Sequence, residues 1–448
     1  MKYPSFLRVV ACLLFLTRFN FSIAYGHDVS TGTYGAREQY QPTPLPDRVV
    51  LTWSSDPTRT IDVTWRTSTS VKKALVEFAV GSELLGDFRS TVTGKRHLVL
   101  ASKEFKSDLG TCLIHTAHLQ GLVPDTMYAY RVGDGNYFSE WHQFKTASES
   151  PQPFTFVYFG DSQNDVRSWW SRVIREANQH APRAAFMLHA GDLVNRANRD
   201  AEWGEWFEAG GWINGMIPVI ASPGNHEYRG KLSRHWRSQF SFPKNGPPGL
   251  EETVYWIDYQ GARIISLNSN EQIELQTDWL KTVLQDPQRP KWTFVTFHHP
   301  IYSAARNRDN ATLRDAWRSV LEDNHVDLVL QGHDHAYARS GLGGPNNAAQ
   351  ASPQVENVSE GVRQSASNTV YVVSVSGPKM YPLQESWEVS RVASGAQLFQ
   401  VIHVEPDMLR YEARLATGKL YDSFTLKKDA RGKNTLTEQI PATPEIRR

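Results

Sequence analysis

From about residue 151 onward, short apolar segments alternate with helical ones, and five of the apolar segments end in a small polar motif. These segments are nearly continuous in hydrophobicity, as expected for strands covered on both faces. Open α/β sheets place their sites beyond the carboxyl ends of the strands. The five motifs are Gly160-Asp161-Ser162-Gln163, Gly191-Asp192-Leu193-Val194-Asn195-Arg196, Gly224-Asn225-His226-Glu227, His298-His299-Pro300 and Gly332-His333-Asp334-His335. The pattern predicts a layered α/β domain with one polar site.

The α/β domain is predicted over residues 149–428, in which strands and helices fit the alternating pattern. The predicted strands are residues 154–159, 184–188, 218–221, 262–267, 292–297, 326–330 and 370–375. The predicted helices are residues 165–179, 275–286 and 311–324.

Residues 47–148 show a different pattern, in which short strands with period-2 alternation are separated by turn residues. This pattern is typical of an antiparallel sandwich. Residues 122–130 resemble the segment of a fibronectin type III domain that carries its buried corner tyrosine. Trp65 resembles the core tryptophan of the same fold. We therefore expect an N-terminal β-sandwich of this type.

The first 26 residues are predicted to be a signal peptide. Lys2 and Arg8 precede an apolar run, and Ala24-Tyr25-Gly26 supplies the small residues of a cleavage site. An uncleaved anchor is the alternative, although the run is shorter than the ~20 residues that span a bilayer. We expect a secreted or periplasmic protein with no transmembrane anchor after signal cleavage.

Composition argues against nucleic acid as a partner and against stabilisation by a disulfide. Without residues 1–26 the chain has 45 Lys and Arg against 47 Asp and Glu, which is no footprint for nucleic acid. Only Cys112 would remain, so no intrachain disulfide is expected. The polar residues 27–46 are expected to form a loose arm, and the charged residues 429–448 a flexible tail.

The residue types at the five strand ends suit a pair of metal ions. Carboxylates, an amide oxygen and imidazoles are suitable ligands for Zn, Mn or Fe. Two ions in one site need a shared carboxylate, and Asp192 is expected to be this bridge because its strand is central. The expected ligands are Asp161, Asp192 and His335 for one ion, and Asp192, Asn225, His298 and His333 for the other.

Each motif taken alone has a plainer interpretation. Gly-Asp after a strand is common in turns, Asn-His can cap a helix, and one residue of His298-His299 can be a satisfied core histidine. Short motifs have high false-positive rates when they occur singly. Five such motifs in one order, each after an apolar strand, favour the metal site.

The ordered set resembles the motifs of the calcineurin-type metallophosphoesterases, and the N-terminal sandwich makes the chain most similar to the purple acid phosphatases. The resemblance covers nearly all of the chain after residue 26. It implies an α+β/α/β protein in which the sandwich precedes a four-layer αββα domain. It also implies a binuclear centre of divalent or mixed-valence ions (Fe, Mn or Zn), and attack on phosphorus by a metal-bound hydroxide.

Four further positions are interpreted through this resemblance. His226 matches a histidine that contacts substrate and can protonate the leaving oxygen. Asn195 stands where the purple enzymes have a tyrosine whose bond to Fe(III) gives the colour, and Gln163 where other members have a histidine. A colourless protein is therefore predicted, in which Gln163 or water completes the coordination of one ion. Asn195 is expected to orient His226. Arg196 matches a phosphate-contacting arginine, or is an exposed residue at a helix start.

Two histidines and two arginines near the motifs have less specific expected roles. His189 and His299 are expected to support the ligands or to line the substrate pocket. The purple acid phosphatases place another histidine some ten residues after His298. This chain offers Arg306 and Arg308 there instead, which would bind phosphate or be solvated.

The leading hypothesis is an exported, acid phosphatase-like hydrolase of small phosphate monoesters. Phosphodiester or nucleotide hydrolysis on the same centre is the nearest alternative, and loops such as residues 228–252 and 339–368 would select between them. A fibronectin-type binding protein with a vestigial metal domain is a third hypothesis. The complete set of ligand positions disfavours it.

Overall fold

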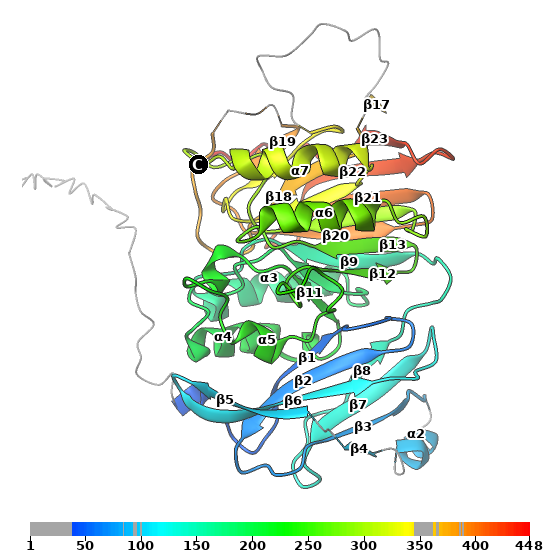
Figure 1. Ribbon diagram of the computed structural model, residues 1–448, viewed down its shortest axis with the longest axis vertical. Helices are drawn as coiled ribbons and strands as arrows, with labels where there is room; N and C mark the ends of the chain where they lie inside the picture. Colours follow the sequence, from blue (N-terminus) through cyan, green and yellow to red (C-terminus); the bar gives the residue numbers. More distant parts are fainter. Residues whose placement is uncertain are drawn as a thin grey trace, which may run out of the picture.

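The computed structural model describes residues 38–83, 85–92, 96–98, 101–344, 362–363, 367–384, 387 and 389–448. In Figure 1, a domain of strands coloured blue and cyan lies below a layered domain coloured green to red. The predicted signal peptide and residues 27–37 of the predicted arm lie outside the described residues. Among the described residues, no helix has the length and apolar character needed to cross a membrane.

The N-terminal domain consists of two four-stranded antiparallel sheets. In sheet order, the first contains β1 (Asp47–Thr52), β2 (Ile61–Ser68), β6 (Gly110–Leu119) and β5 (Ala101–Ser107). The second contains β4 (Arg96–Leu98), β3 (Leu75–Val80), β7 (Met127–Gly133) and β8 (His142–Lys145), with helix α2 (Leu85–Val92) between β3 and β4 in the chain.

Two residues singled out by the sequence lie in the core of this domain. Trp65 is buried, and the hydroxyl of buried Tyr128 accepts a hydrogen bond from the Val123 N–H at 2.9 Å. This bond ties the start of β7 to the preceding turn, as a corner tyrosine does. The two-sheet architecture is therefore confirmed, whereas the relation to fibronectin domains stays a prediction.

The second domain contains an eight-stranded and a seven-stranded sheet. The eight-stranded sheet runs β11 (Val219–Ala221), β10 (Met187–His189), β9 (Phe154–Phe159), β20 (Leu398–Val404), β21 (Met408–Leu415), β22 (Leu420–Lys428), β23 (Asn434–Glu438) and β17 (Val362–Arg363). The seven-stranded sheet runs β12 (Tyr255–Tyr259), β13 (Ala262–Ser266), β14 (Trp292–Thr296), β15 (Leu328–Gln331), β18 (Val370–Val373), β16 (Tyr337–Arg339) and β19 (Arg391–Ala393).

Helices cover the outer faces of both sheets. They are α3 (Val166–His180), α4 (Asp200–Gly210), α5 (Trp236–Gln239), α6 (Ile273–Leu284) and α7 (Ala311–Asp323), with 3-10 turns η1 (Gly211–Ile213) and η2 (Asn225–Glu227). Figure 1 shows α6 and α7 side by side over the strands. The αββα order predicted from the sequence is therefore confirmed.

The alternating directions of the side chains along the central strands explain the four layers. Phe156 of β9 meets Phe294 of β14 across the two sheets, with ring centroids 5.4 Å apart. Phe159, three residues later on β9, points the other way and packs against Trp170 of α3 at 5.8 Å. Because successive side chains of a strand point to opposite faces, one strand can serve both the inter-sheet core and the helix layer.

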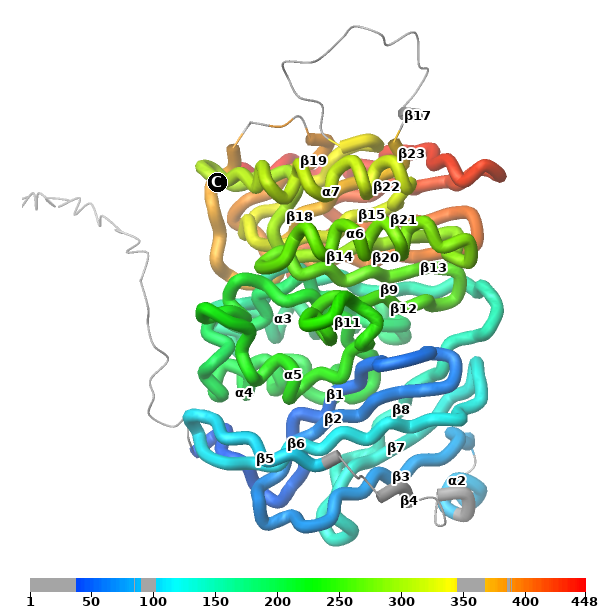
Figure 2. The backbone as a smooth tube through the Cα atoms, in the orientation of Figure 1, coloured from blue at the N-terminus to red at the C-terminus, as the bar shows by residue number. Residues whose placement is uncertain are grey.

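The strands that follow residue 390 were not predicted from the sequence. Strands β20 to β23 form an antiparallel run that pairs with the parallel strand β9 through β20. Figure 2 shows these strands in orange and red, with β20 next to β9 and the other three beyond it. Strands β21 and β22 mix charged residues with apolar ones, and β23 is mostly polar, so these three lack the continuous hydrophobicity of the central strands. Strand β20 is largely apolar.

Two predictions about the chain ends are wrong for the described residues. The predicted flexible tail instead forms β23, and Ile446 then bonds to the Tyr421 hydroxyl and pairs with Ala393. At the other end, the Tyr40 hydroxyl donates to Glu208 at 2.6 Å, and its carbonyl accepts from Arg66 at 2.9 Å. Charged composition at a terminus did not reveal these tertiary partners.

The contact between the domains includes a buried carboxylate at the start of α4. Asp200 accepts hydrogen bonds from Arg48 at 2.6 Å and from Arg66 at 3.2 Å, and both arginines belong to the N-terminal domain. Buried charges need such partners, because an unpaired one costs much free energy. The N-terminal domain therefore holds the helix that follows the Asp192 loop.

Candidate metal centre

The carboxyl ends of five parallel strands bring the six predicted ligands together. They follow β9, β10 and β11 in one sheet and β14 and β15 in the other. A bridge between Asp161 and Val375 joins the two sheets at this edge. Two overlapping groups have donor atoms within 4.8 Å of one another. We call them the Asp161 group (Asp161, Asp192 and His335) and the His298 group (Asp192, His298 and His333).

Two histidines each use Nδ1 for a hydrogen bond to a backbone carbonyl. Their Nε2 atoms then face carboxylate oxygens, which also carry lone pairs. His298 donates from Nδ1 to the Ala190 carbonyl, and His335 donates from Nδ1 to the Lys379 carbonyl, each at 2.9 Å. In the neutral ring Nε2 then carries a lone pair. His298 Nε2 lies 3.1 Å from Asp192 Oδ2, and His335 Nε2 lies 3.2 Å from Asp161 Oδ2. Lone pairs that face one another fit a cation between them.

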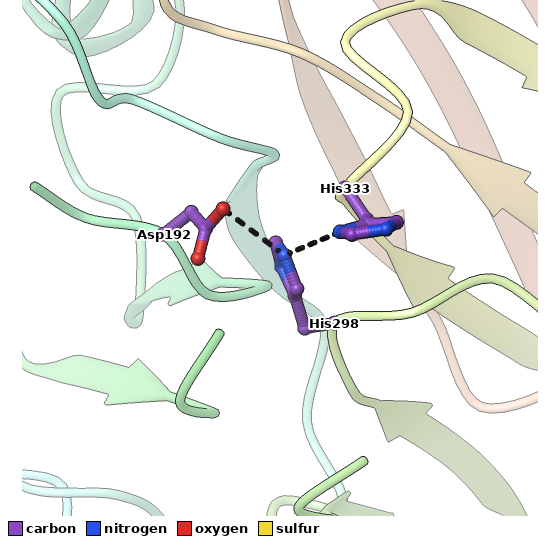
Figure 3. Close-up of side chains that lie close together, drawn as sticks. All are labelled: Asp192, His298 and His333. Carbon is purple, nitrogen blue, oxygen red and sulfur yellow. Dashed lines mark hydrogen bonds and ion pairs between the residues drawn. The ribbon is translucent and has the colours of Figure 1, made fainter. Parts of the chain in front are cut away.

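Figure 3 shows the His298 group, in which Asp192 and His333 lie on either side of His298. His333 Nδ1 is 3.1 Å from His298 Nε2. The Asn225 amide oxygen lies 2.9 Å from His333 Nδ1 and 3.1 Å from His298 Nε2. The side chain of Asn225 is thus placed to be a fourth ligand of this group.

Burial and charge act against each other in the metal-free centre. Burial tends to raise the pKa of Asp192, but His298 and the hydrogen bonds from His298 and His226 hold it well below its usual range. Burial raises the pKa of Asp161 to about 7, against the opposing charge of His298. Burial tends to lower the pKa of His298, but Asp192 and Asp161 raise it to about 9. A proton on His298 compensates the carboxylates here, and a metal cation can replace that proton.

Two buried oxygens beside the Asp161 group accept no hydrogen bond. They are Asp161 Oδ2 and Gln163 Oε1. Gln163 Nε2 lies 3.0 Å from both Asp192 Oδ2 and His335 Nε2, and a half-turn of the amide would exchange the nitrogen for the oxygen. Unsatisfied buried oxygens are rare in native structures, and a bound cation would satisfy both. The residues present therefore fit a metal ion.

The backbone around the ligands is tightly constrained. Asp192, His333 and His335 have φ values of 50°, 72° and 48°, a region that non-glycine residues seldom occupy. A Cβ on Gly224 would lie 2.1 Å from Asp192 Oδ1, and one on Gly332 would lie 2.3 Å from Asp161 Oδ1. Glycine is needed at these two positions because the carboxylates pass so close.

The chain matches two families in sequence. Residues 139–337 match the calcineurin-like phosphoesterase family, and residues 46–146 match the N-terminal domain of purple acid phosphatases. The chain thus carries a calcineurin-like phosphoesterase domain that is preceded by a purple acid phosphatase N-terminal domain. The resemblance predicted from the strand-end motifs is thereby confirmed.

Curated relatives of the chain include purple acid phosphatases. An uncharacterized protein of Mycobacterium tuberculosis is 27% identical over 319 residues, which is 62% of this chain and 59% of that protein. The Fe(3+)-Zn(2+) purple acid phosphatase 12 of Arabidopsis thaliana is 26% identical over 249 residues, 51% of this chain and 52% of that protein. The chain thus matches between about half and three fifths of the length of these curated relatives.

A solved structure shows the same fold. The yellow lupin purple acid phosphatase PPD1 aligns with a TM-score of 0.69 at 19% identity, covering 87% of this chain and 75% of that one. At this identity the likeness shows the fold alone.

His226 lies beside the bridge position, with its side chain 26% exposed. Its Nε2 is 3.9 Å from Asp192 Oδ2, and its Nδ1 donates to the Asn195 carbonyl at 2.6 Å. Asn195, the predicted partner, thus contacts His226 through its backbone carbonyl. The backbone of Asn195 orients the ring, so the side chain at this position is not what holds His226.

Two other predicted roles are modified by the structure. Arg196 donates from both its backbone N–H and its Nε to Glu202 at 2.7 Å, which holds it at the start of α4. His189 packs among Phe159, Trp170 and Trp206, and neither of its ring nitrogens has a hydrogen-bond partner. It therefore fills the core behind the centre, and its expected support of the ligands stays a prediction.

Two acidic residues in the motifs have positioning roles that the sequence analysis missed. Buried Glu227 accepts three backbone hydrogen bonds, from Asp192, Leu193 and Gly224, at 2.8–3.0 Å. Buried Asp334 accepts bonds from Ser303 and from the backbone of residues 304 and 305. Carboxylates inside glycine-rich motifs could have signalled such roles, since exposed backbone N–H groups need acceptors.

An arginine, a lysine and an aromatic ring line one side of the centre. Arg308 donates to the His333 carbonyl at 2.9 Å, and its guanidinium lies 4.6 Å from the ring centroid of Tyr381. Tyr381 in turn packs against His335 at 4.8 Å, and the Lys379 amine lies 5.3 Å from the same ring. Of the two candidate arginines, Arg308 is the one that the structure places beside a predicted ligand.

Proposed function

We propose that the chain is a metal-dependent phosphoesterase that hydrolyses phosphate monoesters. The observation that carries the proposal is the pair of donor groups that share Asp192. A pair of bound ions would lower the pKa of a bound water and neutralise charge that develops on phosphorus. The six candidate ligands are Asp161, Asp192, Asn225, His298, His333 and His335.

His226 is the proposed general acid for the leaving oxygen. Its Nδ1–H is occupied by the Asn195 carbonyl, so Nε2 is the atom that can carry a transferable proton. The ring is partly exposed and lies at the edge of the donor groups. A donor within hydrogen-bond reach of the leaving oxygen is what general acid catalysis requires.

Arg308 is the proposed contact for the phosphate oxygens. The His333 carbonyl and the Tyr381 ring hold its guanidinium beside the His298 group, while 29% of the side chain stays exposed. A guanidinium presents several N–H groups in a plane, so it can bind a phosphate oxygen while one N–H remains on the carbonyl. This contact would replace the histidine that the purple enzymes place nearby.

The metal pair is proposed to be drawn from Fe, Mn and Zn. The name of the Arabidopsis relative states an Fe(3+)-Zn(2+) pair, and mixed carboxylate and imidazole ligands accept each of these ions. Metal analysis of the purified protein should find close to two ions per chain. A value near zero after loading with each ion would contradict the binuclear centre.

A turnover assay tests the function. The protein, loaded in turn with Fe, Mn and Zn, should hydrolyse an aryl phosphate, and a chelator should abolish this activity. An aryl phosphodiester is the second substrate, and faster cleavage of the diester would assign the centre to phosphodiesters instead. No turnover of either ester with any ion would favour a binding protein.

We also propose that the chain is exported. The support is the charged start, the short apolar run and the small-residue site within residues 1–26. Expression of the full chain should give a secreted product whose N-terminus, read by sequencing, begins after Gly26. A cell-retained product with an intact N-terminus would contradict export.

A further inference from the structure

A strongly basic pocket lies between the N-terminal domain and the loop that follows His226. Its cavity of about 460 Å³ is lined by the end of β5 and the turn after it, and by residues 229–235. Four of its lining residues are cations, namely Lys106, Arg229, Lys231 and Arg234. We call this cavity the basic pocket.

Charge in the basic pocket is unbalanced. Among the described residues, none of its four cations has a carboxylate partner within ion-pair distance. The single carboxylate in the lining is Asp108, and its Oδ1 accepts the backbone N–H of Asp200 at 2.9 Å. Four cations against one carboxylate leave an excess of positive charge, which creates a potential that attracts anions.

Cross-links between three segments hold the basic pocket in shape. Arg234 donates to the Lys106 carbonyl at 3.0 Å, which joins the two domains. Ser233 donates to Asn198 Oδ1 at 2.8 Å, which joins the loop to the segment before α4. An antiparallel bridge between Tyr228 and Leu232 closes the turn that presents Arg229 and Lys231. The backbone segments that carry the four cations are therefore held in place by these contacts.

The basic pocket is close to the candidate metal centre along two segments of chain. Arg229 follows His226 by three residues, so their Cα atoms are at most ~11 Å apart. Asn198, which lines the pocket, follows Asn195 by three residues, and the Asn195 carbonyl holds the His226 ring. The general acid thus lies between the metal centre and the basic pocket along the chain.

We propose that the basic pocket binds a second phosphate group of a substrate that carries two or more phosphates. The inference rests on the proposed phosphoesterase function and names its substrate class. One phosphate lies at the metal centre for hydrolysis, and the other is held by Lys106, Arg229, Lys231 and Arg234. The loop of residues 228–252 then selects polyphosphorylated esters over simple monoesters.

Lys106→Ala is the most informative variant, because Lys106 belongs to the N-terminal domain and not to the catalytic loops. Lys103→Ala is the matched control, since Lys103 is exposed on the same strand and does not line the pocket. In Lys106→Ala we expect kcat/KM for a nucleoside diphosphate to fall about tenfold, the usual effect of losing one charge-assisted contact. Turnover of an aryl monophosphate should be unchanged in both variants. Equal losses on both substrates, or none on the diphosphate, would overturn the proposal.

A binding measurement separates this proposal from the proposed function. Calorimetric titration of the full chain with inorganic tripolyphosphate should show about tenfold weaker binding in Lys106→Ala and normal binding in Lys103→Ala. This result would support the pocket even if no ester were hydrolysed, whereas unchanged binding in Lys106→Ala would overturn it. Tripolyphosphate that alters aryl phosphate turnover without competing with the diphosphate would indicate a regulatory anion site, and would overturn the substrate assignment.

Discussion

The two halves of the candidate centre share Asp192 but are built differently. The His298 group has Asn225 as a fourth donor, and His298 Nε2 lies 3.1 Å from a donor atom of each of Asp192, Asn225 and His333. The Asp161 group has two further donors besides Asp192, with only the Gln163 amide beside them. In the metal-free protein this amide turns its nitrogen toward the group and leaves its oxygen without a partner.

The two halves therefore differ in the number of protein ligands that they can offer a metal ion. The His298 group can bind an ion with four protein ligands, which suits a tetrahedral or five-coordinate ion. The Asp161 group needs Gln163 Oε1 or water to complete its ion. A neutral oxygen donates less charge than an imidazole or a phenolate, so we expect this half to hold its metal more weakly.

Replacement of the shared residue should have the largest effect. In Asp192→Asn both halves lose a charged ligand, so we expect metal content to fall well below one ion per chain. Turnover of an aryl phosphate should fall by more than about 1,000-fold, since bound metal supplies several kcal/mol of charge stabilisation. Metal analysis and initial rates measure the two effects. A variant with normal metal content and turnover would show that Asp192 is not the bridge.

Replacement of one histidine in each half should separate them. We expect His298→Ala to lose one ion and to weaken the other only indirectly, and His335→Ala to lose the other ion. Each should reduce turnover by about 100-fold or more, because both ions contribute to the chemistry. Metal content per chain, measured at rising chelator concentration, distinguishes the two. Loss of both ions in both variants would mean that the halves do not bind independently.

The sequence predicted well which residues lie together at this edge, because each one follows an apolar strand that is itself easy to recognise. Asp161, Asp192 and Asn225 had to meet once their strands were parallel neighbours. Strands β21 and β22 were missed because charged residues interrupt their hydrophobic pattern, and the place of β20 beside β9 is a long-range pairing. The hydrogen bond from His226 to the Asn195 carbonyl could not be predicted either, because every residue has a backbone carbonyl and the sequence does not show which one accepts.

A smaller effect is expected from adding the missing imidazole to the weaker half. Gln163→His should tighten metal binding by the Asp161 group by about 10–100-fold, the range over which changes around a metal site alter affinity. The rate of metal loss to a chelator measures this change. Gln163→Leu is the control, because it removes the amide oxygen and should weaken the same half. If both variants lost metal at the rate of the unaltered protein, Gln163 would have no part in the centre.

The smallest effect is expected in the visible spectrum. Protein loaded with Fe(III) should show no strong charge-transfer band, because Asn195 stands where the purple enzymes have their phenolate ligand. Tyr381 must be excluded as an alternative phenolate ligand, since its ring centroid lies 4.8 Å from that of His335. A strong band that disappears in Tyr381→Phe would show that this residue supplies the phenolate from the segment between β18 and β19. A strong band that persists in Tyr381→Phe would contradict the colourless centre and require a different ligand. No band in either protein would leave the Asp161 group as a site built from carboxylates, one imidazole and a neutral oxygen.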